Sequence, residues 1–173
     1  PYTRLIPLKS YLSSSAKVTA ALDSVNALID KTAFAVVGHC EKTLVITDNS
    51  GKRITRNHEC PVGNLIADAL RSVAGAQMGF VNGGGVRTEI KQGDVKFSDL
   101  VNACPFGNQV CLAKCKGSGI AAMLARCAAA YPNENGSFLQ VSGVRFKIDS
   151  GHGNRIVNLM VEDADGQFQA VDP

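Results

Sequence analysis

The stretch FVNGGGVRTEI, Phe80 to Ile90, sets three consecutive glycines between a short apolar run and an arginine. Glycine loses more conformational freedom on folding than any other residue, so three in a row indicate a backbone that another group approaches closely. If these glycines form a loop after a strand that ends at Val81, a ligand can reach the backbone. Asn82 then offers a hydrogen-bond donor and acceptor, and Arg87 offers a permanent positive charge.

The segments around this loop have helical and strand-like patterns. The spacing of apolar residues predicts a helix over 62–76 and a short strand over 78–81. The apolar face of this helix includes Leu65, Ile66, Ala69, Leu70 and Val73. Further predicted elements are a helix over 15–31, two strand-like runs within 34–46, a strand start at 93, a helical turn capped by Ser98, a strand over 109–117, a helix over 118–131, and β segments over 138–150 and 154–168, the last turning at Asp165-Gly166. Strands and helices are mixed without regular βαβ alternation, so we expect an α+β fold with a mixed sheet packed with helices.

Composition indicates one compact unit. The chain has 173 residues, of which 45% are hydrophobic, enough for a core of its own. We expect residues 1–31 to form an N-terminal segment with an amphipathic, linker-type helix, and residues 32–173 to form the domain proper. The 18 basic and 15 acidic residues are spread along the chain and only 6% of residues are aromatic, so a platform for a nucleic-acid polymer is not predicted. No apolar stretch approaches the ~20 residues of a transmembrane helix.

The cysteines favour an oxidising compartment. Six cysteines are many for a cytosolic domain of this size, and no pair has the Cys-x-x-Cys spacing of a metal site. Asn135-Gly-Ser is a candidate glycosylation acceptor, which agrees with secretion. The pairing of six cysteines stays open on counting alone, and the disulfide candidates are Cys40, Cys60, Cys104, Cys111, Cys115 and Cys127.

Two further motifs are better explained by structure than by function. The segment KGSGIAAML, 116–124, resembles a dinucleotide fingerprint, but no acidic residue ends a second strand beyond it, and Ser118 explains it as a helix cap. Asn57-His58-Glu59 resembles one element of binuclear metallophosphatases, but such sites need several further ligands and the chain has three histidines. We therefore expect no metal site and no cofactor in this chain.

Four motifs occur in order across about ninety residues: ITRNHECPVGNLIADAL, FVNGGGVRTEI, NACPFGNQV and FLQVSGVRF. Together they resemble the C-terminal domain of the 5'-nucleotidase family, which includes ecto-5'-nucleotidases, periplasmic UDP-sugar hydrolases and secreted apyrases. The resemblance covers 32–173. It implies that an N-terminal metallophosphatase domain, absent from this chain, holds two divalent metal ions such as zinc and hydrolyses the phosphate ester. This chain would then be the substrate-recognition half of a secreted, metal-dependent nucleotidase.

The resemblance also assigns roles to individual residues. It places Asn82 against the nucleobase, with Gly84 and Gly85 allowing a close approach of the ligand. Phe106 matches the family aromatic that stacks on the base. Arg87 matches an arginine that reaches the phosphate, a task suited to the planar, permanently charged guanidinium. Arg56 matches a second arginine, which faces the substrate near the domain junction.

Other consequences of the resemblance concern the rest of the protein. Cys60 matches a position that is often disulfide-bonded, and Cys40 is the predicted partner. The chain stops at Pro173, before a family loop that carries a second aromatic and an aspartate, so we expect it to be inactive alone and to bind an AMP-like nucleotide or nucleoside weakly. We expect an extracellular, periplasmic or, through the parent, cell-surface location.

Two alternatives remain open. The chain is either the recognition domain of such a nucleotidase or an autonomous secreted binding module that performs no catalysis. A third arrangement is a processed protein in which a partner chain supplies the catalytic half. In that case the amphipathic helix and an unpaired sheet edge would be the docking surfaces.

Overall fold

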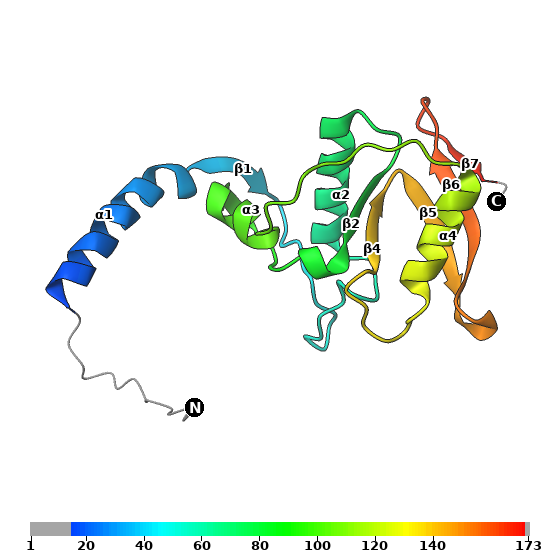
Figure 1. Cartoon of the computed structure of the whole chain (residues 1–173), viewed down its shortest axis with the longest axis horizontal. Coiled ribbons are helices and arrows are strands. Elements are labelled where there is room, and N and C mark those ends of the chain that lie inside the picture. Colours follow the sequence, from blue (N-terminus) through cyan, green and yellow to red (C-terminus); the bar gives the residue numbers. More distant parts are fainter. Residues whose placement is uncertain (1–14, 172–173) are drawn as a thin grey trace, which may run out of the picture.

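A computed structural model describes residues 15–171 and has both helices and strands, which confirms the α+β class (Figure 1). The elements are α1 (Ala16–Ala33), β1 (Val36–Cys40), α2 (Pro61–Ala74), β2 (Gly79–Asn82), the 3-10 helix η1 (Gly83–Gly85), β3 (Gly93–Lys96), α3 (Phe97–Ala103), α4 (Gly117–Ala128), β4 (Leu139–Ser142), β5 (Val144–Asp149), the 3-10 helix η2 (Ser150–His152), β6 (Arg155–Glu162) and β7 (Phe168–Ala170). The first 14 residues of the predicted N-terminal segment lie outside the described part of the chain.

The strands form three small antiparallel sheets where the sequence predicts one mixed sheet. In the described residues β1 pairs with β3, β2 with β4, and β5 with β6, which continues to β7. The β2–β4 pair matters most for function because it sets Val81 opposite Gln140 and Asn82 opposite Leu139. This register brings the glycine loop beside the segment that enters β4.

Helix α2 begins and ends at recognisable caps. Pro61 occupies its first turn, the Cys60 Sγ accepts a hydrogen bond from the Gly63 N–H at 3.3 Å, and Gly75 closes the helix with a φ of +56°. The buried side is formed by Val62, Gly63 and Ala67. The predicted apolar face is therefore wrong in part, since Leu65 and Val73 are exposed in the structure.

The helix approaches β2 closely because β2 begins with a glycine. A Cβ on Gly79 would lie 2.2 Å from the Ala67 carbonyl oxygen of α2. The interior then divides into two clusters. One contains Cys60, Val62, Val86 and Ile90 and so includes the residue that follows the three glycines. The other joins α4 to the three-stranded sheet through Ile120, Leu124, Val144 and Leu159.

Two predicted details differ from the structure. The segment 109–116, predicted as most of a strand, has no regular secondary structure and is exposed along its whole length. Helix α3 starts at Phe97, with Lys96 as its N-cap, where the sequence predicts a cap at Ser98. The Asp99 carboxylate accepts the Lys96 N–H at 2.8 Å and thereby satisfies a backbone donor at the start of the helix.

Helix α1 extends away from the rest of the molecule (Figure 1). Val18, Leu22, Val25 and Ile29 form an apolar stripe along it at helical spacing, and each is about half exposed. Its C-terminal end packs near α3, where Ile29 and Ala33 face Phe97 and Val101 across a groove. Among residues 15–171, no helix combines the length and apolar character needed to cross a membrane.

Candidate functional site

The site begins with the glycine that the fold itself requires. Gly83 follows β2, and its N–H donates a hydrogen bond of 2.6 Å to the Phe138 carbonyl. A Cβ at this position would lie 1.8 Å from the Thr55 carbonyl oxygen, which no backbone can accept without moving. The close approach predicted from the sequence is therefore made, at Gly83, by another part of the protein.

Gly84 and Gly85 have a different environment. The Gly84 N–H donates to the Gly136 carbonyl at 3.0 Å, and a Cβ on Gly84 would lie 3.1 Å from that oxygen. A Cβ on Gly85 would lie 3.3 Å from the Asn82 Oδ1. Both residues line an open cavity, so side chains here would also narrow the space available to a ligand.

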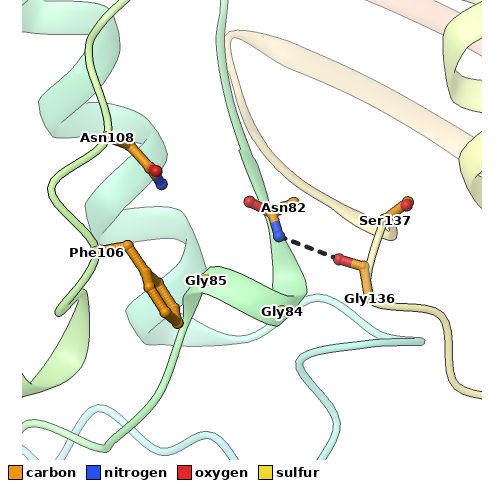
Figure 2. A pocket seen from close by; sticks show the side chains of 7 residues that line it. All are labelled: Asn82, Gly84, Gly85, Phe106, Asn108, Gly136 and Ser137. Carbon is orange, nitrogen blue, oxygen red and sulfur yellow. Dashed lines mark hydrogen bonds between the residues drawn. The ribbon is translucent and has the colours of Figure 1, made fainter.

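This cavity has a volume of about 430 Å³. Figure 2 shows Phe106 and Asn108 on one side, Gly136 and Ser137 on the other, and Asn82, Gly84 and Gly85 between them. Four of the six predicted site residues thus surround one space: Asn82, Gly84, Gly85 and Phe106. Asn108, Gly136 and Ser137 were missed by the sequence analysis, although Asn108 belongs to the quoted PFGN motif and the other two to the glycosylation acceptor.

The cavity offers an aromatic surface and polar atoms together. Phe106 is 50% exposed and belongs to neither hydrophobic cluster of the described residues. Its ring is therefore free to stack on a planar ligand in the cavity. The Asn82 Nδ2 donates to the Gly136 carbonyl at 3.2 Å, which holds the side chain in place and leaves its Oδ1 as an acceptor at the cavity (Figure 2). An exposed ring beside an oriented amide can recognise a flat heterocycle.

The two predicted arginines lie outside the residues that line the cavity. Arg87 is exposed and next to it, since its guanidinium donates to the Gly84 carbonyl at 3.4 Å. Arg56 is half-buried, and its Nε is buried with no hydrogen-bond partner among the described residues. Each therefore retains guanidinium donors for an anion.

A third arginine, Arg53, was missed by the sequence analysis. It donates to the Thr55 Oγ1 at 3.0 Å and to the Val86 carbonyl, so it joins the segment before Arg56 to the glycine loop. Burial, and after it the positive charges of Arg87 and Arg56, lowers the pKa of Arg53. The three guanidinium groups are thus close enough to form one positively charged region.

All six candidate cysteines are free thiols in the structure, and the predicted Cys40–Cys60 disulfide is not formed in it. The Cys40 Sγ donates to the Lys42 carbonyl at 3.0 Å, whereas Cys60 caps α2. Burial raises the pKa of the Cys60 thiol, which keeps it protonated. The two residues nevertheless pack in the same apolar cluster.

The glycosylation candidate Asn135 has a structural role. Its Nδ2 donates to the Cys127 carbonyl at 3.3 Å, and its Oδ1 accepts the Ser137 N–H at 3.0 Å. Its backbone N–H donates to the Arg56 carbonyl at 2.9 Å. Asn135 therefore shapes the cavity rim and connects it to the arginine segment.

The histidines lie apart from one another. His39 contacts Asp94 at 3.1 Å, His58 contacts the Asn57 Oδ1 at 3.0 Å, and His152 contacts Asp149 at 2.7 Å. Within residues 15–171, no three His, Cys, Asp or Glu side chains converge as metal ligands would.

Similar proteins are nucleotidases. The chain is 26% identical over 96% of its length to the trifunctional nucleotide phosphoesterase protein YfkN of Bacillus subtilis, of which it covers 12%. It is 32% identical over 69% of its length to the bovine 5'-nucleotidase, of which it covers 23%. The crystal structure of a 5'-nucleotidase precursor from Thermus thermophilus superposes with a TM-score of 0.70 and 30% identity, over 90% of this chain and 30% of that one. The chain thus spans less than a third of each of these relatives.

The family model that matches is "5'-nucleotidase, C-terminal domain", and it matches residues 36–173, from the first strand onward. Four ordered motifs, the α+β fold and the superposition agree with this match. The chain belongs to the 5'-nucleotidase C-terminal domain family.

Proposed function

We propose that this domain recognises the nucleoside and phosphate of a nucleotide, which the N-terminal domain of the same parent hydrolyses with two bound divalent metal ions. The observation that carries the proposal is the convergence of Asn82, Gly84, Gly85 and Phe106 on one cavity. The base stacks on Phe106 and hydrogen-bonds to Asn82. The phosphate extends toward Arg87 and Arg56.

The arginine region supports the phosphate assignment. Burial, and after it repulsion by the positive charges of Arg87 and Arg56, lowers the pKa of Arg53 in the ligand-free domain. A phosphate relieves that repulsion and accepts charge-assisted hydrogen bonds from the guanidinium groups. Arg87 lies beside the cavity wall at Gly84, so base and phosphate contacts are compatible with one ligand.

The location and catalysis of the parent protein are also part of the proposal. We place it outside the cytoplasm on the number of cysteines and the Asn135-Gly-Ser acceptor in the sequence, and not on disulfides, since the structure has all six cysteines as free thiols. The chain alone is proposed to be inactive, because it spans less than a third of relatives that are named as a nucleotide phosphoesterase and a 5'-nucleotidase.

A titration by NMR tests the binding site. AMP, adenosine and UDP-glucose are added to the chain, and the backbone amide shifts are followed. We expect saturable shifts from Asn82 to Arg87 and around Phe106. Phe106→Ala should weaken all base-containing ligands by about 1–3 kcal/mol. Arg87→Ala should weaken AMP by about 1.5–3 kcal/mol while affecting adenosine little.

Phe97→Ala is the matched control, since Phe97 is similarly exposed but lies in the groove next to α1. It should leave ligand affinity unchanged. Absence of shifts at millimolar ligand, or equal losses in Phe97→Ala and Phe106→Ala, would contradict the proposed function.

A further inference from the structure

A buried glutamine on β4 contacts the segment that carries Arg56. Gln140 is 1% exposed, and its side chain crosses from the β2–β4 pair to the turn 55–60. Its Nε2 donates to the Thr55 carbonyl at 3.0 Å and to the His58 carbonyl at 2.7 Å, and its Oε1 accepts the Cys60 N–H at 3.0 Å. One amide thus satisfies three backbone groups on both sides of Arg56.

These partners fix the orientation of the amide. The two carbonyl oxygens need the NH₂ group as a donor, and the Cys60 N–H needs the amide oxygen as an acceptor. A flipped amide would therefore place oxygen against oxygen at two contacts and N–H against N–H at the third. Gly63 leaves the room that the side chain needs, since a Cβ there would lie 2.5 Å from the Gln140 side chain. A fully satisfied buried network of this kind specifies a single arrangement of the turn.

The turn is in contact with both other parts of the site. The Thr55 carbonyl lies against Gly83, where no Cβ fits. The Arg56 carbonyl accepts the Asn135 N–H at 2.9 Å, next to the cavity rim. The turn, and with it Arg56, is therefore held by Gln140 from one side and by the cavity rim from the other.

We propose that Gln140 is a positioning residue that fixes Arg56 relative to the cavity and so sets the affinity for the phosphate of the ligand, while the nucleoside affinity depends on Phe106 and Asn82. This inference rests on the proposed function. It adds that phosphate recognition is controlled by a residue that touches no ligand. Loss of the Gln140 contacts removes three of the hydrogen bonds that hold the turn. Phe106 and Asn108 belong to another segment, and Asn82 keeps its own bond to the Gly136 carbonyl.

Affinities for AMP and adenosine, measured by calorimetry on the chain and on Gln140→Met, test the proposal. Methionine has similar length but makes none of the three hydrogen bonds. AMP affinity should fall by about tenfold, the effect of losing roughly one charge-assisted contact, whereas adenosine affinity should stay within about twofold. The amide resonances from Arg56 to Cys60 should shift as well.

Ser142→Ala is the matched control. Ser142 is buried at the next inward-facing position of β4 and lies opposite Gly79, away from the turn. It should preserve both affinities. Arg56→Ala should lower AMP affinity alone.

The outcomes separate the two proposals. If the unmodified chain does not prefer AMP to adenosine, or if Arg56→Ala leaves that preference intact, the assignment of Arg56 to phosphate fails, whatever Gln140 does. If both hold and Gln140→Met weakens the two ligands equally, or weakens neither, the positioning role of Gln140 is wrong.

Gln140→Glu keeps the test decisive if Gln140→Met does not fold. Its ionised carboxylate would face the Thr55 and His58 carbonyls without a proton, and protonation restores one donor. The measured quantity is the ratio of AMP affinity to adenosine affinity in Gln140→Glu, divided by the same ratio in the unmodified chain. This quantity should rise as the pH falls from about 8 to about 5.5, because a buried carboxyl group has a raised pKa and becomes protonated in this range. A constant ratio would overturn the proposal.

Discussion

Gly83 is a residue at which three segments of the chain meet. Its N–H is bonded to Phe138, and its Cα faces the Thr55 carbonyl. The glycine is therefore required for packing of backbone on backbone. Gly84 and Gly85 instead form the wall of the cavity.

The different roles of these glycines predict different mutational costs. Gly83→Ala places a Cβ 1.8 Å from a backbone oxygen, so we expect a loss of at least about 1–3 kcal/mol in the free energy of unfolding. Urea denaturation followed by circular dichroism measures it. Gly119→Ala is the control, because an added Cβ there would meet nothing within 4 Å beyond its chain neighbours and the backbone of α4 itself. This change should stabilise the chain by about 0.5–1 kcal/mol. A Gly83→Ala chain as stable as the unmodified one would show that the turn yields easily.

At the residue scale, the sequence predicts those site residues whose type is unusual in its local context. A glycine run, an arginine after it and a phenylalanine between proline and glycine in a predicted loop each stand out, and three of the residues concerned line the cavity. Gly136 and Ser137 reach it through the β2–β4 pairing, which joins segments 54 residues apart at the Asn82–Gly136 bond. No local pattern reveals such a pairing. Arg53 has no conspicuous signal either, since its role depends on its contact with Val86.

At the scale of elements, the turn between β6 and β7 is organised by one carboxylate. Asp163 accepts hydrogen bonds from the Gln169 Nε2 at 2.9 Å, the Gln167 N–H at 2.9 Å and the Asp165 N–H at 3.0 Å. The bond from the Gln169 side chain, followed by that from the Gln167 backbone, lowers the pKa of Asp163. The predicted Asp165-Gly166 turn is confirmed, with Gly166 at a φ of +76°.

A lowered pKa makes this hairpin sensitive to acid. The ionised form is favoured in the folded state, so the stabilisation is fully present at neutral pH and is lost as the pH falls through the folded pKa, below the ordinary aspartate value of about 3.9. The amide shifts of Asp165 and Gln167, followed by NMR against pH, should have a midpoint below that value. Asp163→Asn should abolish the transition, whereas Asp165→Asn, which changes the same charge in the same turn, should preserve it. A midpoint at or above about 3.9 would contradict the role given to Asp163.

Helices and strands are predicted correctly where the apolar pattern of the sequence comes from packing against the core. The helix over 118–131 and the β segments that became β4 to β6 are predicted by periodicity because they bury one face against a cluster within the same domain. Segment 109–116 has alternating residues but no pairing partner among the described residues, so the pattern does not become a strand. The apolar face of α2 was placed wrongly at Leu65 and Val73 because the helix contacts β2 and β4 through Gly63 and Ala67, while Ile66 of the predicted face does pack against the core.

At the scale of the whole molecule, α1 packs less closely than the other elements and lies outside the part of the chain that the family model matches. The family model begins at residue 36, after α1. The apolar stripe on α1 is about half exposed, and its contact with α3 is limited to the groove of about 300 Å³ that Ile29 and Phe97 help to line. The boundary predicted between 31 and 32 falls within the last turn of this helix.

Deletion of residues 1–33 tests whether the domain is independent. This cut keeps Phe34, whose ring lies 5.2 Å from the Lys96 Nζ, and Ala35, whose carbonyl accepts the Phe97 N–H at 3.0 Å. We expect Tm to change by less than about 4 °C, equivalent to about 1 kcal/mol, and AMP shifts to be unchanged. Removal of the exposed stripe should also raise solubility. Loss of amide dispersion in the shortened chain would show that α1 is part of the folding unit.

The charged region formed by Arg53, Arg56 and Arg87 has a consequence for ionic strength. Counterions screen the mutual repulsion of the three guanidinium groups, and they equally screen the attraction of those groups for a phosphate. Added salt should therefore stabilise the arginine region of the ligand-free domain and lower the affinity of the domain for a nucleotide. The ionic strength at which the parent protein works would then set the balance between the unoccupied and the occupied site.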